Sequence, residues 1–249
     1  MSKILIVSDM HVGSKYALAP DNFNTHRNNA VQKTILSKWE EMASSDSFDY
    51  LILNGDLTDG LQKACNGKDV WTTDIDEQID AAVELINKID YDKLLVAYGT
   101  PYHTGENLNA DAILADKLNA DFQDYEINFQ PKGQSDIFHI AHSINVSLSS
   151  WQYRTTSIAK ELVAALLNEK ELYKYRGVIR SHAHYYCKVD FSNSFGIVTP
   201  CWQTRTPYLV RKGLQLIPKL GWVTLSDEEG DWTVGAHCFN IPSPDKVEI

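Results

Sequence analysis

The sequence predicts a layered α/β protein with mixed β-sheets, and three patterns indicate this fold class. First, short apolar runs alternate with segments of helical periodicity through much of the chain. Second, several of these runs end at an aspartate, a glycine turn or a histidine. Third, short strands without intervening helices follow near the C-terminal end, as in an antiparallel sheet. Because these features extend over nearly the whole chain, we predict one domain spanning residues 1–249.

The N-terminal elements follow from periodicity and from turn residues. Residues 3–8 form a continuous apolar run, as expected for a strand that is buried on both faces. A long polar loop leads to a helix over residues 28–43, in which apolar residues recur with helical spacing. The second strand covers residues 50–53. Residues 57–73 lack a clean period and are predicted to form a loop beside the site.

The middle of the chain is predicted to alternate between helices and strands. Asp74 is expected to cap the second helix. A third core strand covers residues 94–97, and another helix follows it. Residues 122–129 alternate in polarity, which predicts a half-buried antiparallel strand, and a Pro-Lys-Gly turn joins it to a strand over residues 136–142.

The C-terminal part combines a regular helix with short strands. Residues 157–173 carry one apolar stripe at helical spacing and predict a helix that packs on a sheet. The strands that follow are joined by polar turns and are predicted to form a second, antiparallel sheet. They cover residues 185–191, 195–199, 220–225 and 232–239.

Residues of metal-ligand type follow the predicted strands in a regular way. Ligands bind beyond the carboxyl ends of strands in α/β folds, so several such ends are expected to converge on one site. Carboxylates and imidazoles without cysteine suit divalent Mn, Fe or Zn, and an oxygen of Asp56 can bridge two such ions. The groups at strand ends are Asp9 with His11, Asp56 after Gly55, His103 after the turn at Gly99, His142, and His182 with His184.

The order of these groups resembles that of the calcineurin-like metallophosphoesterase superfamily. Its pattern of Asp-x-His, Gly-Asp, Gly-Asn-His, His and Gly-His-x-His is followed over residues 1–200. Two positions depart from it, because Thr100 stands in place of Asn and Ser181 in place of Gly. The resemblance, which is to the nuclease and phosphodiesterase branch, implies an α+β fold of αββα type: a two-sheet mixed β-sandwich flanked by helices.

The resemblance also implies a dinuclear centre, with Mn²⁺ as the expected metal and Fe or Zn as alternatives. A hydroxide that bridges two cations would attack the phosphorus atom, and Asp56, which holds both cations, would be a catalytic residue. The implied ligands are Asp9, His11, Asp56 and His184 for one cation, and Asp56, His142 and His182 for the other.

His103 lies two residues further along the chain than the family histidine, because Pro101 and Tyr102 intervene. Two roles are open for it: a ligand of the second cation in place of the missing Asn, or the acid that protonates the leaving group. We favour ligation, since an imidazole reaches further than an amide. Asp59 is expected to be a turn residue or the partner of a ligand, and not a ligand itself.

Aromatic and basic residues near the site indicate the substrate. Trp202, Arg205 and Arg211 follow the last His pair and Arg154 follows His142, and such residues suit a nucleobase and a phosphate. The alternative for these segments is an interface or a cover over the core. We predict hydrolysis of a phosphodiester in a nucleotide or nucleic acid. The alternatives are a phosphomonoesterase acting on protein or a small metabolite, and an inactive binding module with this fold.

The composition narrows the class of protein further. The formal charge of −10 argues against a surface that binds nucleic acid broadly, because phosphate contacts need clustered Lys and Arg. The four cysteines are scattered, without the spacing of a zinc ribbon. No apolar run approaches the roughly 18 residues of a membrane span. We therefore expect a cytoplasmic protein that makes no contact with a membrane.

Overall fold

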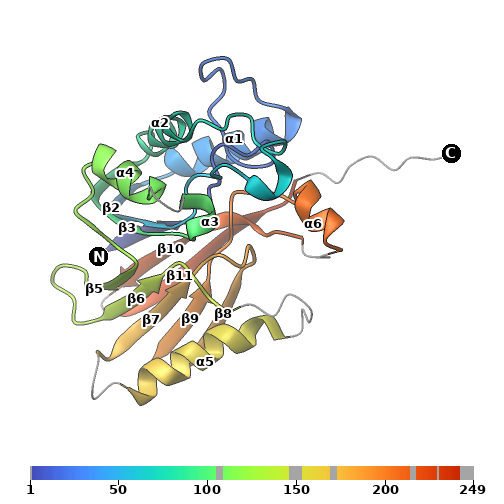
Figure 1. Cartoon of the computed structure of the whole chain (residues 1–249). Coiled ribbons are helices and arrows are strands. Elements are labelled where there is room, and N and C mark those ends of the chain that lie inside the picture. The colour runs from blue at the N-terminus through green and yellow to red at the C-terminus, as the bar shows by residue number, and fades with distance from the viewer. Residues whose placement is uncertain are drawn as a thin grey trace.

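Two β-sheets pack face to face between two layers of helices, as Figure 1 shows. The computed structural model describes residues 2–104, 109–145, 153–168, 173–213, 217–228 and 230–241. The predicted αββα sandwich is confirmed. No helix in these described ranges is both long and apolar enough to span a membrane.

The first sheet has the strand order β11-β10-β1-β2-β3-β4 and is mixed. The strands β1 to β4 are parallel, whereas β10 runs antiparallel to β1, and β11 runs antiparallel to β10. Helices α1, α2 and α4 cover its outer face (Figure 1). The bounds are β1 Lys3–Val7, α1 Ala30–Ala43, β2 Ser47–Asn54, α2 Ile75–Ile86, β3 Asp90–Ala97, α4 Ala110–Lys117, β4 Phe122–Asp124, β10 Leu220–Glu228 and β11 Asp231–Phe239.

The second sheet has the strand order β5-β6-β7-β9-β8. Its three central strands are parallel and its two edge strands are antiparallel to their neighbours. Helix α5 covers its outer face (Figure 1). The bounds are β5 Glu126–Phe129, β6 Ile137–Ala141, α5 Arg154–Leu167, β7 Tyr175–Arg180, β8 Cys187–Phe191 and β9 Ser194–Val198.

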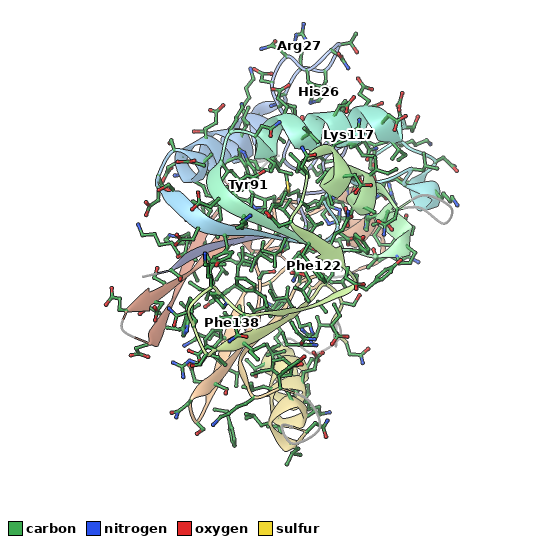
Figure 2. The ribbon with its side chains drawn as sticks, turned by 90° about the vertical axis from the view of Figure 1, so that its left-hand side faces the viewer. His26, Arg27, Tyr91, Lys117, Phe122 and Phe138 are labelled. Atoms are coloured by element: carbon green, nitrogen blue, oxygen red, sulfur yellow. The ribbon has the colours of Figure 1, made fainter. Side chains whose placement is uncertain are left out.

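Alternation along the strands divides the core into layers. In β1, Ile4 and Ile6 point into the core between the sheets, whereas Leu5 and Val7 point toward the helices α1 and α2. Phe138 of β6 is fully buried in the layer between the sheets, which Figure 2 shows filled with side chains. Both faces of β1 are therefore covered, as its continuous apolar sequence predicts.

Most predicted elements are present, with their boundaries adjusted. Asp74 caps α2, as predicted, by accepting hydrogen bonds from the backbone N–H groups of Asp76 and Glu77. Helix α5 begins earlier than predicted, at Arg154, and ends at Leu167; residues 169–172 of the predicted helix lie outside the described residues.

Two predictions about strands are wrong. Residues 122–129 form two strands and not one, because the chain leaves the first sheet after β4 and joins the second sheet as β5. The C-terminal strands do not form one antiparallel sheet either. Instead, β10 and β11 complete the first sheet, and β9 lies parallel to β7 in the second. Alternation in a sequence specifies a strand but not its partner.

Three short helices lie in segments that were predicted as loops. They are the 3₁₀ helix η1 at Lys63–Cys65, α3 at Pro101–Thr104 and α6 at Pro207–Arg211. Both α-helical turns begin with proline, which tolerates the first helical position because its missing N–H would have no partner there. Helices α3 and α6 contribute residues to the cavity described below.

Candidate metal centre

The predicted metal ligands converge at the carboxyl ends of parallel strands in both sheets. Asp9 and His11 follow β1, and Asp56 follows β2, at one edge of the first sheet. His142 follows β6, and the pair at positions 182 and 184 follows β7, at the facing edge of the second sheet. Among the described residues, three groups could hold a cation. The first is Asp9 with His11 and His184, the second is Asp56 with His142 and His182, and the third is His11 with Asp59 and His103.

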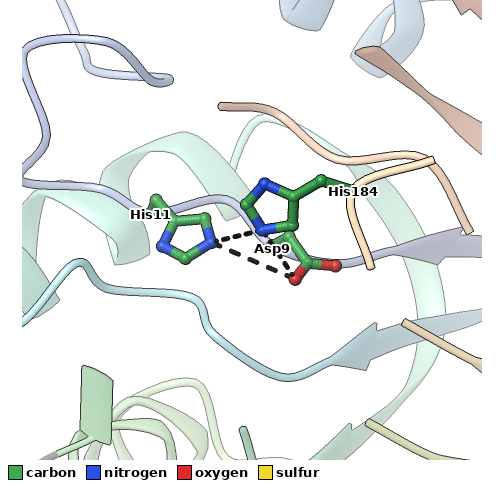
Figure 3. Close-up of side chains that lie close together, drawn as sticks. All are labelled: Asp9, His11 and His184. Atoms are coloured by element: carbon green, nitrogen blue, oxygen red, sulfur yellow. Dashed lines mark hydrogen bonds and ion pairs between the residues drawn. The ribbon is translucent and has the colours of Figure 1, made fainter. Parts of the chain in front are cut away.

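The first group is compact and buried. The Nε2 atoms of His11 and His184 lie 3.0 Å apart. The Oδ1 atom of Asp9 lies 3.3 Å from His184 Nε2 and 4.0 Å from His11 Nε2. Figure 3 shows the three side chains pointing at one another. Two imidazole nitrogens and a carboxylate oxygen that face one small volume are a donor set for Mn, Fe or Zn.

The second group adjoins the first. The Oδ2 atom of Asp56 lies 3.0 Å from His142 Nε2 and 3.9 Å from His182 Nδ1. His142 Nε2 also lies 3.9 Å from Asp9 Oδ1, which belongs to the first group. The two groups therefore form one continuous cluster of carboxylates and imidazoles.

Hydrogen bonds behind the cluster fix the orientation of two imidazoles. His142 Nδ1 donates to the carbonyl oxygen of Asn54 at 2.7 Å, so Nε2 is the nitrogen that faces the cluster. His11 Nδ1 donates to Asp59 Oδ1 at 3.1 Å, with the same result. Outer partners of this kind are usual for histidines that ligate metals, because they select the tautomer and the ring orientation. Asp59 therefore orients the imidazole of His11, and it also forms a group with His11 and His103 that could hold a cation.

Three buried polar atoms in the cluster make no well-aligned hydrogen bond, although two of them lie 3.0 Å and 3.3 Å from an atom of opposite charge in the same cluster. They are Asp9 Oδ1, His142 Nε2 and His182 Nδ1. A buried polar atom without a partner costs about 1–3 kcal/mol, so such atoms are rare unless a ligand satisfies them. All three point into the cluster, and a divalent cation in each group would supply the missing partner. The residues present therefore fit the implied metal.

The carboxylates and imidazoles of the cluster shift each other's pKa values. Burial alone would raise the pKa of Asp9, but the imidazoles of His142 and His184 outweigh it and lower the pKa to about 2. Burial alone would lower the pKa of His142, but the carboxylates of Asp56 and Asp9 raise it to about 9. The carboxylates therefore favour a proton on His142, and a cation held there would compete with that proton.

The backbone of these ligands is unusual. The φ angle is positive, between 48° and 68°, at five of the predicted ligands. Residues other than glycine avoid this left-handed region, which costs about 1–2 kcal/mol per residue. Such strain gathers at functional sites, where the surrounding structure enforces it. The set comprises Asp9, His11, Asp56, His182 and His184.

Two glycines of the motifs are explained by close packing around Asp56 and His142. A Cβ atom on Gly99 would lie 2.2 Å from Asp56 Oδ1. A Cβ atom on Gly55, where φ is +76°, would lie 2.5 Å from His142 Nδ1. Any side chain at either position would displace the second group of ligands.

Thr100 and His103 occupy the segment that departs from the family pattern. The backbone N–H and the hydroxyl of Thr100 donate to Asp56 Oδ1 at 2.7 Å and 3.0 Å. The two inserted residues, Pro101 and Tyr102, begin the helical turn α3, which continues through His103 to Thr104. His103 Nδ1 donates to the carbonyl oxygen of Asp59 at 3.0 Å, and Nε2 lies 4.0 Å from Asp56 Oδ2. His103 groups with His11 and Asp59, and not with the second group.

Two further residues, Asp111 and Ser181, support the cluster in roles that the sequence analysis did not predict. Asp111, in the first turn of α4, accepts hydrogen bonds from the backbone N–H groups of Asp56 and Gly99. Burial and the nearby Asp56 raise the pKa of Asp111 to about 6. Ser181, which replaces the family glycine, is fully buried and accepts a hydrogen bond from Asn54 Nδ2 at 2.6 Å. A single polar residue in a sequence does not indicate that its side chain forms hydrogen bonds with the residues around a site.

A cavity of about 480 Å³ opens onto the cluster. Its walls come from the loop after β2, from α3, from the connection between β7 and β8, and from the segment that includes α6. The lining residues are His11, Ser14, Asp59, Gln62, Asp69, Thr100, Tyr102, His103, His182, Ala183, His184, Gln203, Thr206, Tyr208 and Leu209.

The predicted substrate-binding residues lie outside this lining, and one of them is excluded from any contact with substrate. Trp202 is 0% exposed, and its ring packs against Trp39 and Trp222 in the core. Arg154 lies over the ring of Tyr185. Arg205 and Arg211 are exposed on the segment that carries α6, and Arg211 pairs with Asp69 of the cavity wall at 3.4 Å. The sequence alone does not tell whether an aromatic residue near a motif points into the core or toward the substrate.

Comparison with known proteins gives a match in fold alone. No protein-family model matches the sequence, and no curated protein matches it. A solved archaeal phosphodiesterase is similar, with a TM-score of 0.50 and 14% identity over 94% of this chain and 99% of that one. Vps29 of Entamoeba histolytica in complex with zinc has a TM-score of 0.44 and 10% identity, covering 96% of this chain and 99% of that one. The chain has the calcineurin-like metallophosphoesterase fold.

Proposed function

We propose that this protein is a metal-dependent phosphoesterase that holds two divalent cations and hydrolyses a phosphodiester. The observation that supports the proposal is the pair of adjoining carboxylate and imidazole groups, with buried unpaired atoms, at the floor of a cavity. Asp9, His11 and His184 would hold one cation, and His142 and His182 the other. Asp56 is proposed to bridge them, as the sequence indicates.

The bound cations would supply Lewis-acid stabilisation of the phosphoryl oxygens and lower the pKa of a coordinated water. The chain itself contributes orientation. The carbonyl of Asn54 and the carboxylate of Asp59 hold the imidazoles of His142 and His11 with Nε2 toward the cluster. Thr100 holds Asp56 through two hydrogen bonds. Because these partners are fixed before substrate binds, little reorganisation accompanies the reaction.

His103 is proposed to protonate the leaving group, which is the alternative to ligation that the sequence left open. Its ring lines the cavity at a side-chain exposure of 15%, and the carbonyl of Asp59 binds the Nδ1–H group. When the ring is protonated, Nε2–H is the proton that faces the cluster and the substrate. On this proposal His103→Ala keeps both cations, but it slows the hydrolysis of substrates that have poor leaving groups.

The proposal is tested by metal analysis together with hydrolysis of bis-p-nitrophenyl phosphate and p-nitrophenyl phosphate in the presence of Mn²⁺. We expect two cations per chain and faster hydrolysis of the diester. Asp56→Asn should lose at least one cation and about a hundredfold in kcat, because an amide cannot bridge two cations as a carboxylate does. Asp227→Asn is the matched control, since Asp227 is buried but binds Gln134 and the backbone of Gly230 away from the cluster.

The other outcomes identify the alternatives. Faster hydrolysis of the monoester would support a phosphomonoesterase. Two bound cations without hydrolysis of either substrate would support a binding module. Near-normal turnover by Asp56→Asn with both cations in place would exclude the bridge.

A further inference from the structure

The walls of the cavity above the metal cluster differ in character from its floor. The floor consists of imidazoles, whereas the walls carry two aromatic rings that are half exposed, Tyr102 at 49% and Tyr208 at 41%. Leu209 of α6 lies beside Tyr208 in the same wall. A volume of about 480 Å³ is within the range of about 300–1,000 Å³ that is typical of sites for one small molecule.

The lining of the cavity has no lysine or arginine among its described residues, which disfavours substrates with several phosphates. The lining also includes the carboxylates of Asp59 and Asp69. Basic side chains on the segment that carries α6 lie outside the lining. Of these, Arg211 is paired with Asp69, and Lys212 Nζ lies 5.8 Å from the centroid of the Tyr208 ring. A polyanion needs a basic contact for most of its phosphates, because electrostatic attraction supplies much of its affinity. A chain with a formal charge of −10 would repel one.

We infer that the substrate is a small phosphoester with a single phosphate, whose remaining part is uncharged and apolar or aromatic and packs against Tyr208 and Leu209. This inference rests on the proposed function for the phosphate and on the cavity walls for the rest. It makes Tyr208 and Leu209 determinants of specificity, because an aromatic face and a branched aliphatic chain favour a flat or apolar partner. Nucleic acid strands are disfavoured by the same surface.

Binding of phosphonates to the Mn²⁺-loaded protein tests the inference without any need for turnover. In calorimetric titrations at fixed salt, wild-type protein should bind phenylphosphonate about tenfold more tightly than methylphosphonate. Hexylphosphonate separates an aromatic preference from a merely apolar one. Tyr208→Ala and Leu209→Ala should each reduce the preference for phenylphosphonate, and Tyr208→Phe should keep it. Phe191→Ala removes an exposed ring on β8, outside the lining, and should change nothing.

Three results would overturn the inference. One is equal affinity of the wild-type protein for phenylphosphonate and methylphosphonate. Another is a preference that survives in both alanine variants. The third is a ten-nucleotide thymidine strand that binds more tightly than phenylphosphonate at physiological salt. Failure to hydrolyse bis-p-nitrophenyl phosphate would count against the proposed function alone, since the phosphonates report binding and not catalysis.

Discussion

At the scale of single residues, five of the proposed ligands have a left-handed backbone conformation that residues with a side chain disfavour. His182 has φ 68°, and its side chain is 38% exposed, so little packing is lost when it is shortened. In the metal-free protein, His182→Gly should be more stable to unfolding by urea than His182→Ala by about 1 kcal/mol, because glycine adopts this φ without a penalty. Both variants should lose metal to a similar extent.

His139 provides the matched control for this comparison. It lies in β6, and it is absent from the described residues with positive φ. There the order should reverse, with His139→Gly less stable than His139→Ala by about 0.5–1 kcal/mol. The same order at both positions would mean that the backbone at His182 is not strained in solution.

Single residues also show which parts of the site can be predicted from the sequence. That these carboxylates and imidazoles would lie together was predictable, because they recur at the ends of strands. Their role as metal ligands stays a prediction. Trp202 was misjudged because its burial depends on Trp39 and Trp222, which are remote in sequence. Asp111 gave no signal, because its hydrogen bonds to backbone N–H groups leave no pattern in a sequence. Ser181 was visible as a departure from the family glycine, but its hydrogen bond with the side chain of Asn54 was not predictable.

At the scale of elements, the segment between β9 and α6 connects the core to the metal cluster. The N–H group of Trp202 donates to the carbonyl of Asp9 at 3.0 Å, while its ring is fully buried. We expect Trp202→Ala to lower the free energy of unfolding by about 3–5 kcal/mol. It should also weaken metal binding about tenfold or more, because the space left by the ring lets the backbone that donates to Asp9 shift. Thermal unfolding and metal titration measure the two effects separately.

Trp232→Ala distinguishes this role from general destabilisation. Trp232 is buried between the sheets against Phe138, far along the chain from any proposed ligand. Trp232→Ala should lower the free energy of unfolding by about as much as Trp202→Ala does, and it should leave the metal affinity unchanged. If both variants weaken metal binding equally, Trp202 has only a packing role.

Elements differ in how well periodicity reveals them. The long helices α1 and α2 were predictable because their apolar stripes extend over several turns. The turns α3 and α6 are too short to show a period, although Pro101, and Thr206 followed by Pro207, are start signals that point to them. The break at Tyr125, where the chain changes sheets, coincides with an interruption of the alternation, because Phe122 and Tyr125 are three residues apart.

At the scale of the whole molecule, the convergence of the strand ends was predictable and the strand order was not. Parallel strands joined by helices place their carboxyl ends at one edge, whichever order they take. The placement of β10 beside β1 joins residues more than two hundred positions apart, and no local pattern encodes that pairing. The αββα layering nevertheless followed from the resemblance, since its motifs fix which ends must meet.

The cluster joins ligands from both sheets, and His11 and His184 are 173 residues apart in sequence. Such contacts can form only after both sheets are complete and packed together, late on the folding route. Bound Mn²⁺ should therefore slow unfolding while leaving the rate of refolding unchanged, because stabilising contacts that are absent from the transition state act on unfolding alone. Stopped-flow traces with Mn²⁺ and with a chelator test this, and faster refolding with metal would contradict it. Metal supply would then set how long each folded molecule lasts, and not how quickly it forms.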